Sequence, residues 1–312
     1  MTRLARLGLG CWAFGGGLWR TQQRGDSIRT IHAAVRGGIR HYDTAQGYGK
    51  GVSEQMIGQQ LRRFSREMPR AAYTLATKIH LPSKVEDLEP LVQLSLRRLC
   101  TPYVDILYIH WPDSTKELEP YLIELERIRS SGLCIHLGVS NFPSALMSTA
   151  MQYARISYCQ IPVSLLWLNS LTDCARLCRE GGIRIVGYSP LGLGLLSGAY
   201  RREDHLAPGD FRRRLYCYRK PYLPVFHTLL DSLETVSFRM GISCSEAALL
   251  WARMQPVDTI LCGARTKAQM LGSLATDDLS VPLEAFDPIH EIATELSALI
   301  PQEEDNIFFH RW

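Results

Sequence analysis

Four side chains able to carry acid–base chemistry follow short apolar stretches of this sequence. They are Asp43, Tyr48, Lys78 and His110. The carboxylate ends the run 39–43, the amine ends 72–78 and the imidazole ends 104–110, while the phenol lies among glycines just after the first run. If these runs are buried strands of a parallel barrel, their ends share the face on which active sites of such barrels lie. The sequence therefore predicts that a phenol, an amine, a carboxylate and an imidazole meet at one face.

A single polar residue at a strand end is more often a solvated loop residue than a catalyst. Here four ionisable groups occupy successive strand ends, and each follows a stretch that is otherwise apolar. Chance explains such an ordered set much less well than it explains any single residue of the set. We therefore interpret the four residues as a candidate active site.

Eight β-rich runs alternate with helical patterns along the chain. We expect strands at 7–12, 39–43, 72–78, 104–110, 134–139, 156–160, 183–188 and 259–262. Strict alternation favours a parallel sheet, and eight repeats in 312 residues favour its closure into a (β/α)8 TIM barrel. A long irregular loop follows the seventh strand, from 189 to about 224, and two extra helices are expected towards the C-terminus. No linker interrupts the chain, so residues 1–312 are predicted to form one domain.

Composition narrows the class of protein. Hydrophobic residues make up 46% and charged residues 21%, with a net charge of only +4, so neither nucleic-acid binding nor membrane binding is indicated. The nine cysteines lack the spacing of a zinc site and are interpreted as reduced thiols. With no signal peptide pattern and no apolar run long enough to span a bilayer, we expect a soluble cytoplasmic protein without a metal.

Several common functional motifs are missing. Gly8 and Gly10 lack the third glycine of a G-x-G-x-x-G dinucleotide loop, no phosphate-binding P-loop is present, and the sequence around Ser140 is not a nucleophile elbow. The remaining histidines show no H-x-x-x-H pattern and are interpreted as surface or core residues. They are His32, His41, His80, His136, His205, His227, His290 and His310.

A set of short motifs, in a fixed order from about residue 6 to 270, resembles the aldo-keto reductase superfamily. It is most similar to the bacterial branch that also resembles potassium-channel β subunits. The matching stretches are Leu7–Gly10, Gly15–Gly16, Trp19, Asp43–Ala45, Tyr48–Gly49, Ser53–Glu54, Thr77–Lys78, Asp105–Leu107, His110, Gly138–Phe142, Gln160, Tyr188–Pro190, Gly194–Gly198, Gly263–Thr266 and Gln269. Each motif alone is weak, but the ordered set is specific.

The resemblance implies a barrel enzyme that transfers hydride reversibly between NADPH and a carbonyl. It implies that Tyr48 protonates the carbonyl oxygen, that Lys78 and Asp43 tune this phenol, and that His110 orients the substrate. The chemistry agrees, because hydride addition leaves an alkoxide that needs a proton. A free phenol with a pKa of about 10 is a reluctant donor. An ammonium group about 4 Å away is therefore expected to favour the phenolate by up to about 4 kcal/mol.

The resemblance also implies a cofactor site. Tyr188 would stack on the nicotinamide, and Ser140, Asn141 and Gln160 would bind its carboxamide. Backbone N–H groups of residues 191–198 would surround the pyrophosphate, and Arg265 would bind the 2′-phosphate and so favour NADPH over NADH. The full expected set is Ser140, Asn141, Gln160, Tyr188, Ser189, Leu191, Gly194, Gly263, Arg265 and Gln269. The chain departs from the family pattern with Ala199 before Tyr200 and with Gly272 and Ser273 after Gln269, which affects the adenine contacts.

The substrate end is less defined by the sequence. Trp19 and Trp111 are candidate substrate contacts, and the aromatic tail 308–312 would either line the site or pack elsewhere. Basic residues 212–214, 219 and 220 would bind a phosphorylated or carboxylated substrate or form a solvated loop. A small aldehyde or ketone, sugar-like or phosphorylated, is the expected substrate. Two other functions stay open: a lyase or aldolase using Lys78 as a Schiff-base amine, and a nicotinamide-binding sensor or interaction subunit with little turnover.

Overall fold

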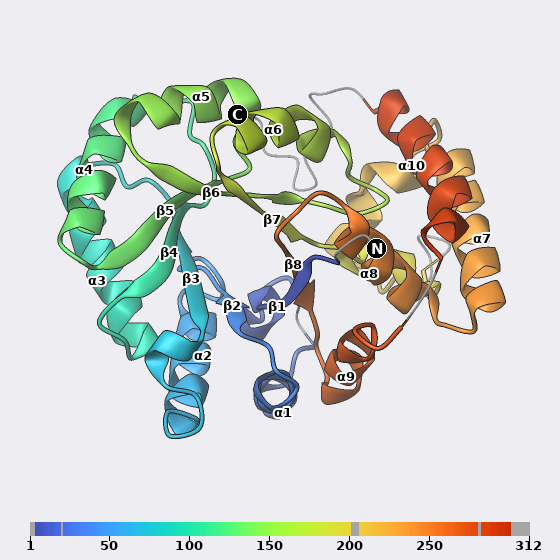
Figure 1. Ribbon diagram of the computed structural model, residues 1–312, viewed down its shortest axis with the longest axis horizontal. Helices are drawn as coiled ribbons and strands as arrows, with labels where there is room; N and C mark the ends of the chain where they lie inside the picture. Colours follow the sequence, from blue (N-terminus) through green and yellow to red (C-terminus); the bar gives the residue numbers. More distant parts are fainter. Residues whose placement is uncertain (1–3, 20, 201–205, 280–281, 301–312) are drawn as a thin grey trace.

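Eight parallel strands close into a barrel in this computed structural model, which describes residues 4–19, 21–200, 206–279 and 282–300 (Figure 1). Each strand pairs with the next in the chain, and the last pairs with the first. The strands are β1 (Arg6–Gly10), β2 (His41–Asp43), β3 (Thr74–Ile79), β4 (Val104–Ile109), β5 (Cys134–Ser140), β6 (Ile156–Pro162), β7 (Arg184–Tyr188) and β8 (Thr259–Gly263). The predicted (β/α)8 barrel is confirmed.

Ten α-helices of the described residues surround the barrel. They are α1 (Arg24–Arg36), α2 (Val52–Arg63), α3 (Leu88–Leu99), α4 (Leu118–Ser130), α5 (Ser144–Tyr153), α6 (Asn169–Glu180), α7 (Leu223–Met240), α8 (Cys244–Met254), α9 (Lys267–Ala275) and α10 (Asp287–Leu299). Both α7 and α8 lie between β7 and β8, and α10 follows α9. One helix of the β7–β8 connection and α10 are therefore the two helices expected beyond a regular barrel. Helices α7 and α10 pack side by side at the right of Figure 1.

Element boundaries follow the local chemistry. The N-terminus of α8 has a capping box, in which Ser243 accepts from the Glu246 N–H and the Glu246 carboxylate accepts from the Ser243 N–H. Thr266 caps α9 through its side chain. The first helix, in contrast, begins at Arg24 without any side-chain cap. β2 is shorter than expected, with only His41–Asp43 in the sheet.

Alternation along β4 explains how the barrel is filled. Ile106 and Tyr108 point into the barrel and contact Ala76, Val186 and other interior residues. The intervening side chains of β4 belong to the larger core between the strands and the helices. Burial of each aliphatic side chain contributes about 1.5–3 kcal/mol, so both layers stabilise the positions of the strand ends. None of the helices in the described ranges is long and apolar enough to cross a membrane.

The long connection after β7 is irregular, as predicted, but it contains short 3-10 turns. These are η4 (Gly192–Ser197), η6 (Phe211–Arg214) and η7 (Tyr216–Tyr218). The segment containing η6 is tied to the one containing η4, because Arg212 Nη1 donates to the Leu193 carbonyl oxygen at 3.0 Å. The connection therefore folds against the mouth of the barrel, above the strand ends that carry the candidate site.

Candidate active site

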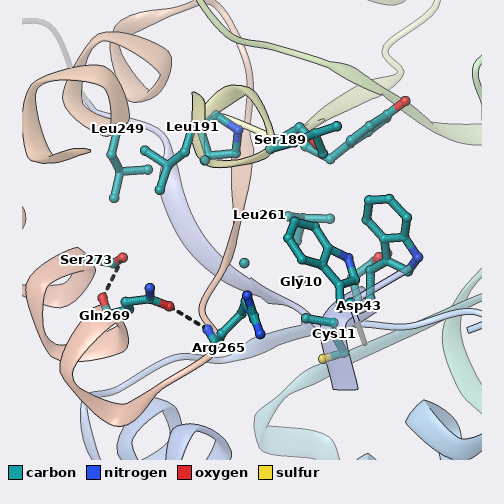
Figure 2. Close-up of a pocket in the computed structure, with 18 of the residues that line it drawn as sticks. Gly10, Cys11, Asp43, Ser189, Leu191, Leu249, Leu261, Arg265, Gln269 and Ser273 are labelled. Atoms are coloured by element: carbon teal, nitrogen blue, oxygen red, sulfur yellow. Dashed lines mark hydrogen bonds between the residues drawn. The ribbon is translucent and has the colours of Figure 1, made fainter. Parts of the chain in front are cut away.

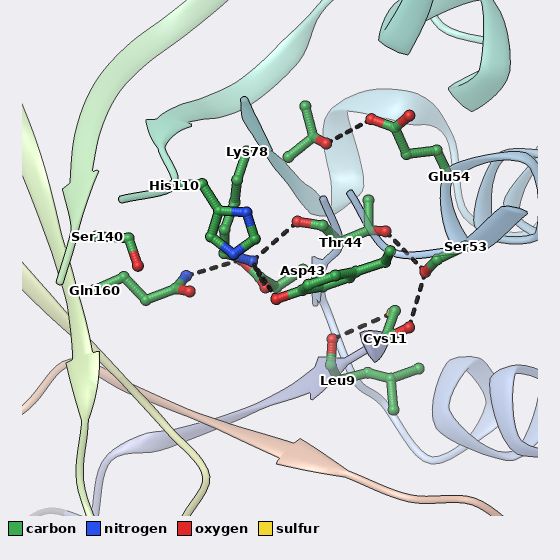
Figure 3. Close-up of polar contacts among 12 residues, drawn as sticks. Leu9, Cys11, Asp43, Thr44, Ser53, Glu54, Lys78, His110, Ser140 and Gln160 are labelled. Carbon is green, nitrogen blue, oxygen red and sulfur yellow. Dashed lines mark hydrogen bonds and ion pairs between the residues drawn. The ribbon is translucent and has the colours of Figure 1, made fainter. Parts of the chain in front are cut away.

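A buried ion pair lies beneath the C-terminal rim of the barrel, at the ends of β2 and β3 (Figure 3). Lys78 is only 1% exposed and Asp43 only 3%. The Lys78 ammonium contacts the Asp43 carboxylate and also donates to the Thr44 carbonyl oxygen at 2.9 Å and to the Tyr48 hydroxyl at 3.3 Å. The second Asp43 oxygen accepts from Gln160 Nε2 at 2.8 Å. The carboxylate therefore pairs with the lysine in a buried position and fixes its orientation.

The phenol of Tyr48 has its pKa raised well above the usual value in this structure. Burial is the main cause, and the negative charge of Asp43 adds to it. In the free protein, burial and the charge of Asp43 therefore outweigh the preference for the phenolate that an ammonium group alone would give. The phenol accordingly holds its proton at neutral pH, which is the form that a proton donor needs.

The imidazole of His110 lies beside the phenol. It follows the last residue of β4, is 9% exposed, and its ring centroid is 5.5 Å from that of Tyr48 at an interplanar angle of 76°. Its backbone is held by the Ile79 carbonyl oxygen at 2.8 Å and by Asn141 Nδ2 at 3.1 Å. The structure thus brings together all four predicted groups, which we call the four-residue cluster (Asp43, Tyr48, Lys78 and His110).

The loop that carries Tyr48 packs directly against η1 (Trp12–Gly15). A Cβ on Gly49 would lie 2.1 Å from the Gly15 carbonyl oxygen, and one on Gly15 would lie 2.5 Å from the Tyr48 carbonyl carbon. Gly49 also has a φ of +61°, in the left-handed region. Side chains are therefore excluded from both positions, and this close approach fixes where the phenol sits.

Gly49→Ala is expected to destabilise the protein by more than the strain of a left-handed alanine, which is about 1–2 kcal/mol. The added methyl group must displace η1, so carbonyl reduction should fall as well. Urea unfolding and initial rates measure the two effects. Gly132→Ala is the matched control, since Gly132 has a φ of +84° but open space around its Cβ position. Equal losses of stability in the two variants would show that the contact with Gly15 is unimportant.

A cavity of about 810 Å³ opens above the four-residue cluster and runs along the barrel mouth (Figure 2). It is lined by the whole expected cofactor set and by the two candidate substrate contacts Trp19 and Trp111. Tyr48, His110 and Asp43 also line it. The size is in the range of small-molecule and cofactor sites, and its length joins the reactive groups to the helix α9.

Comparison with known proteins agrees with this geometry. The model of the aldo/keto reductase family matches residues 6–293. The chain belongs to the aldo-keto reductase family. It is 31% identical to aldo-keto reductase YhdN of Bacillus subtilis (strain 168), over 85% of this chain and 83% of that protein, and 30% identical to the NADH-specific methylglyoxal reductase of Escherichia coli (strain K12), over 89% and 91%. The glycerol dehydrogenase AKR11B4 from Gluconobacter oxydans superposes with a TM-score of 0.82 at 29% identity, covering 96% and 94% of the two chains.

Members of the aldo-keto reductase family use nicotinamide cofactors, and the part of the cavity beside the four-residue cluster suits the nicotinamide end. Tyr188 closes β7, and its hydroxyl donates to Asn141 Oδ1 at 2.6 Å. Asn141 in turn donates to Ser140 Oγ at 3.0 Å. Gln160 is anchored by Asp43, as described above. These four polar side chains come from three adjacent strand ends; Ser140, Asn141 and Tyr188 are joined by hydrogen bonds, and Gln160 is held by Asp43.

The segment 191–198 of this aldo-keto reductase differs from the expectation that its N–H groups surround the pyrophosphate. The N–H groups of Gly192, Gly194 and Leu196 donate to carbonyl oxygens of residues 189 and 191. These three groups are therefore already used within the segment. A buried guanidinium, that of Arg212, lines the cavity there, paired with Asp210 and 4.6 Å from the Tyr200 ring centroid. Of the basic residues predicted in this loop, it alone lines the cavity among the described residues.

The part of the cavity where adenine is expected to bind is lined by residues of α9 and of the loop before it. Arg265 Nε donates to Gln22 Oε1 at 3.0 Å, Gln22 Nε2 donates back to the Arg265 carbonyl oxygen at 2.9 Å, and the guanidinium also contacts the Thr21 hydroxyl. Gln269 accepts from the Arg265 N–H at 2.8 Å (Figure 2). The predicted departure from the family pattern is visible at Gly272, which lines the cavity with no atom within 4 Å of its Cβ position. No side chain fills that place.

Lys78 does not line the cavity. Its ammonium is buried, contacts the Asp43 carboxylate, and donates to Thr44 and Tyr48. A Schiff-base mechanism needs an amine that a carbonyl carbon can reach in its neutral form. This arrangement therefore argues against the lyase or aldolase that the sequence left open.

Trp12 and His80 line the cavity but were not assigned to the site from the sequence, and Arg212 was only one of several candidate loop cations. Trp12, which was assigned to the first strand, packs against Trp19 and Tyr48 with ring centroids 5.4 and 6.3 Å apart. His80 was interpreted as a surface or core residue, and Arg212 as one of a group of loop cations. Their only sequence signal was proximity to a predicted strand end or loop. The aromatic tail 308–312 lies outside the described residues.

Proposed function

We propose that this aldo-keto reductase reduces an aldehyde or ketone to an alcohol, with hydride from NADPH and a proton from Tyr48. The observation that carries the proposal is the contact of the Tyr48 hydroxyl with the ammonium of the buried Lys78–Asp43 pair, at the floor of a cofactor-sized cavity. Bound NADPH supplies the hydride. The residues of this chain supply the proton and the environment for the charge that develops on oxygen.

Proton transfer follows from the geometry of the four-residue cluster. Tyr48 Oη donates its proton to the carbonyl oxygen as that oxygen becomes an alkoxide, and the phenolate left behind is 3.3 Å from Lys78 Nζ. Asp43 keeps that lysine charged in its buried position. The low effective dielectric of a buried site strengthens the attraction between phenolate and ammonium. This attraction lowers the free energy of the transition state relative to that of the bound carbonyl.

His110 is proposed to orient the substrate. A neutral imidazole donates one N–H, and its position 5.5 Å from the Tyr48 ring lets both groups reach the same oxygen. Two donors converging on one oxygen fix the face of the carbonyl that is presented to the cofactor. The indole rings of Trp12, Trp19 and Trp111 line the same end of the cavity and exclude water from it.

The residues of the cavity fit a nicotinamide dinucleotide. Amide and hydroxyl groups of Ser140, Asn141 and Gln160 line one part of the cavity. Two cations, Arg212 and Arg265, also line it, and each guanidinium lies 5.5 Å from the Trp19 ring centroid. Ser189, Leu191, Gly194 and Gly263 line the cavity as well. Tyr188 presents its ring beside the amide groups. We propose that this order of contacts matches carboxamide, nicotinamide, pyrophosphate and adenosine phosphate along one bound molecule.

Titration with NADPH and with NADH, followed by cofactor fluorescence, tests the binding part of the proposal. A panel of aldehydes and ketones then tests the chemistry by loss of NADPH absorbance. Reduction of at least one class of carbonyl supports the proposal. Tight binding of NADPH with no oxidation across the whole panel would instead favour the sensor or interaction subunit.

We also propose that Arg265 selects NADPH. The E. coli relative is named as NADH-specific. The choice between NADPH and NADH therefore differs within the family and must depend on particular residues. Arg265 lines the adenine end of the cavity and is held by the neutral side chains of Gln22 and Thr21, which leave its charge in place. A planar guanidinium suits bidentate binding of a phosphate group.

Arg265→Ala is expected to weaken NADPH binding about 10-fold to 100-fold, because hydrogen bonds to charged groups contribute about 1.5–3 kcal/mol. NADH affinity should change by less than about 3-fold, since that cofactor has no 2′-phosphate. Fluorescence titration of both cofactors measures the ratio. Lys267→Ala is the matched control, because Lys267 is an exposed cation of α9 that does not line the cavity. An unchanged ratio of the NADPH and NADH affinities in Arg265→Ala would show that Arg265 does not select between the two cofactors.

A further inference from the structure

A second imidazole lies at the substrate end of the cavity. His80 follows β3 directly, two residues after Lys78, and it is exposed while lining the cavity. Its ring centroid is 4.8 Å from that of His110, with an interplanar angle of 38°. On its other side, the Cβ position of Gly47 is 3.6 Å from His80 Nε2. The ring therefore occupies the space between the proposed carbonyl-orienting histidine and the loop that carries Tyr48.

The carboxylates that line the cavity do not compete with a bound anion for the position beside His80. Asp43 and Glu246 are the carboxylates that line it among the described residues. Asp43 is engaged by Lys78 and Gln160, and Glu246 belongs to the capping box of α8. Both carboxylates are thus already satisfied by cationic or N–H groups. An anion placed beside His80 would gain a cation without meeting an unsatisfied carboxylate.

We propose that His80 is a specificity-determining residue, which binds a carboxylate or phosphate group of the substrate while the carbonyl oxygen lies between Tyr48 and His110. The proposal rests on the function proposed above. The 4.8 Å between the two rings corresponds to about three carbon–carbon bonds of about 1.5 Å. The preferred substrates are accordingly short aldehydes or ketones whose anionic group is only a few bonds from the carbonyl.

The groups that face His80 permit this role. His110 packs against the ring of His80, Tyr48 packs against His110, and the Lys78–Asp43 pair close to Tyr48 carries no net charge when both members are ionised. An anion bound beside the ring of His80 would favour the charged form of that imidazole. The preference for anionic substrates should therefore be greatest at low pH and decline as pH rises through the range in which imidazoles titrate.

The test compares pairs of substrates that differ in charge. Succinic semialdehyde is paired with its methyl ester to probe a carboxylate, and glyceraldehyde 3-phosphate with glyceraldehyde to probe a phosphate. In His80→Phe, which keeps a ring but removes the cation, the ratio of kcat/KM for the charged over the neutral member should fall about 10-fold, or about 1.4 kcal/mol. His80→Lys should restore the ratio and keep it to higher pH. The pair that responds identifies the anionic group.

His290→Phe is the matched control, because His290 is an exposed histidine of α10 that does not line the cavity. An unchanged ratio for both substrate pairs in His80→Phe would overturn the inference while leaving the proposed reduction intact. If the wild-type protein reduces none of the four compounds, the wider aldehyde and ketone panel decides the proposed function, and binding decides the inference separately. Tryptophan fluorescence titration with succinate and with inorganic phosphate should then give dissociation constants that rise about 10-fold in His80→Phe; equal constants would overturn it.

Discussion

Tyr48→Phe is expected to abolish carbonyl reduction while nicotinamide-cofactor binding stays nearly unchanged. The substitution removes one hydroxyl, 3.3 Å from Lys78 Nζ, and keeps the ring that packs against Trp12 and His110. A positioned proton donor contributes about 10²–10⁴-fold to the rate, so kcat should fall by at least about 10²-fold. Initial rates with an aldehyde that the wild-type protein reduces measure this loss, and NADPH fluorescence measures binding.

Tyr153→Phe provides the comparison for the loss of a tyrosine hydroxyl, because Tyr153 lies on α5 outside the cavity. It should reduce the same aldehyde at the wild-type rate. Turnover close to wild type in Tyr48→Phe would exclude the phenol from proton transfer. Loss of NADPH binding together with activity would assign Tyr48 a role in binding instead.

Lys78→Met should lower both activity and stability. It leaves the carboxylate of Asp43 buried without its cationic partner, which costs about 3–5 kcal/mol for a buried pair. It also removes the positive charge beside the phenol, so kcat should fall by about 10²-fold or more. Urea unfolding and initial rates separate these two effects.

The double variant Asp43→Asn/Lys78→Met distinguishes the chemical role of the pair from its structural role. Neutralising the carboxylate removes most of the unpaired charge, so stability should recover by about 2–4 kcal/mol relative to Lys78→Met alone. Activity should stay as low as in the single variant. Recovery of turnover together with stability would mean that Lys78 serves folding rather than the charge on Tyr48.

Much of the fold could be predicted from the sequence, for a physical reason. Strands buried on both faces are short apolar runs such as 104–109, and each helix between them keeps one apolar face for the barrel. The positions of the candidate site followed from the same pattern, since parallel strand ends share one face. That shared face brought Asp43, Lys78 and His110 close together in the structure. Their roles in catalysis, and the extent of the domain over residues 1–312, stay predictions.

Features that depend on packing between distant segments were not visible in the sequence. His80 becomes part of the site only because β3 and β4 are neighbours, and Trp12 only because η1 packs on the loop of Tyr48. The N–H groups of 191–198 were expected to face a phosphate, yet several are used within the segment, which adopts left-handed φ values at Gly192, Leu193 and Gly194. The direction of the Tyr48 pKa shift depends on burial, which residue types alone do not give.

A single carboxylate connects opposite sides of the barrel mouth, because Asp43 holds Lys78 with one oxygen and Gln160 with the other. One N–H of the Gln160 amide is thereby committed, so its carbonyl oxygen and remaining N–H are left for a ligand. Under the proposed roles, the acidity of Tyr48 and the binding of the nicotinamide carboxamide by Gln160 are therefore linked through Asp43. A replacement of Asp43 that changes the acidity of the phenol is then expected to change the affinity for the nicotinamide cofactor as well.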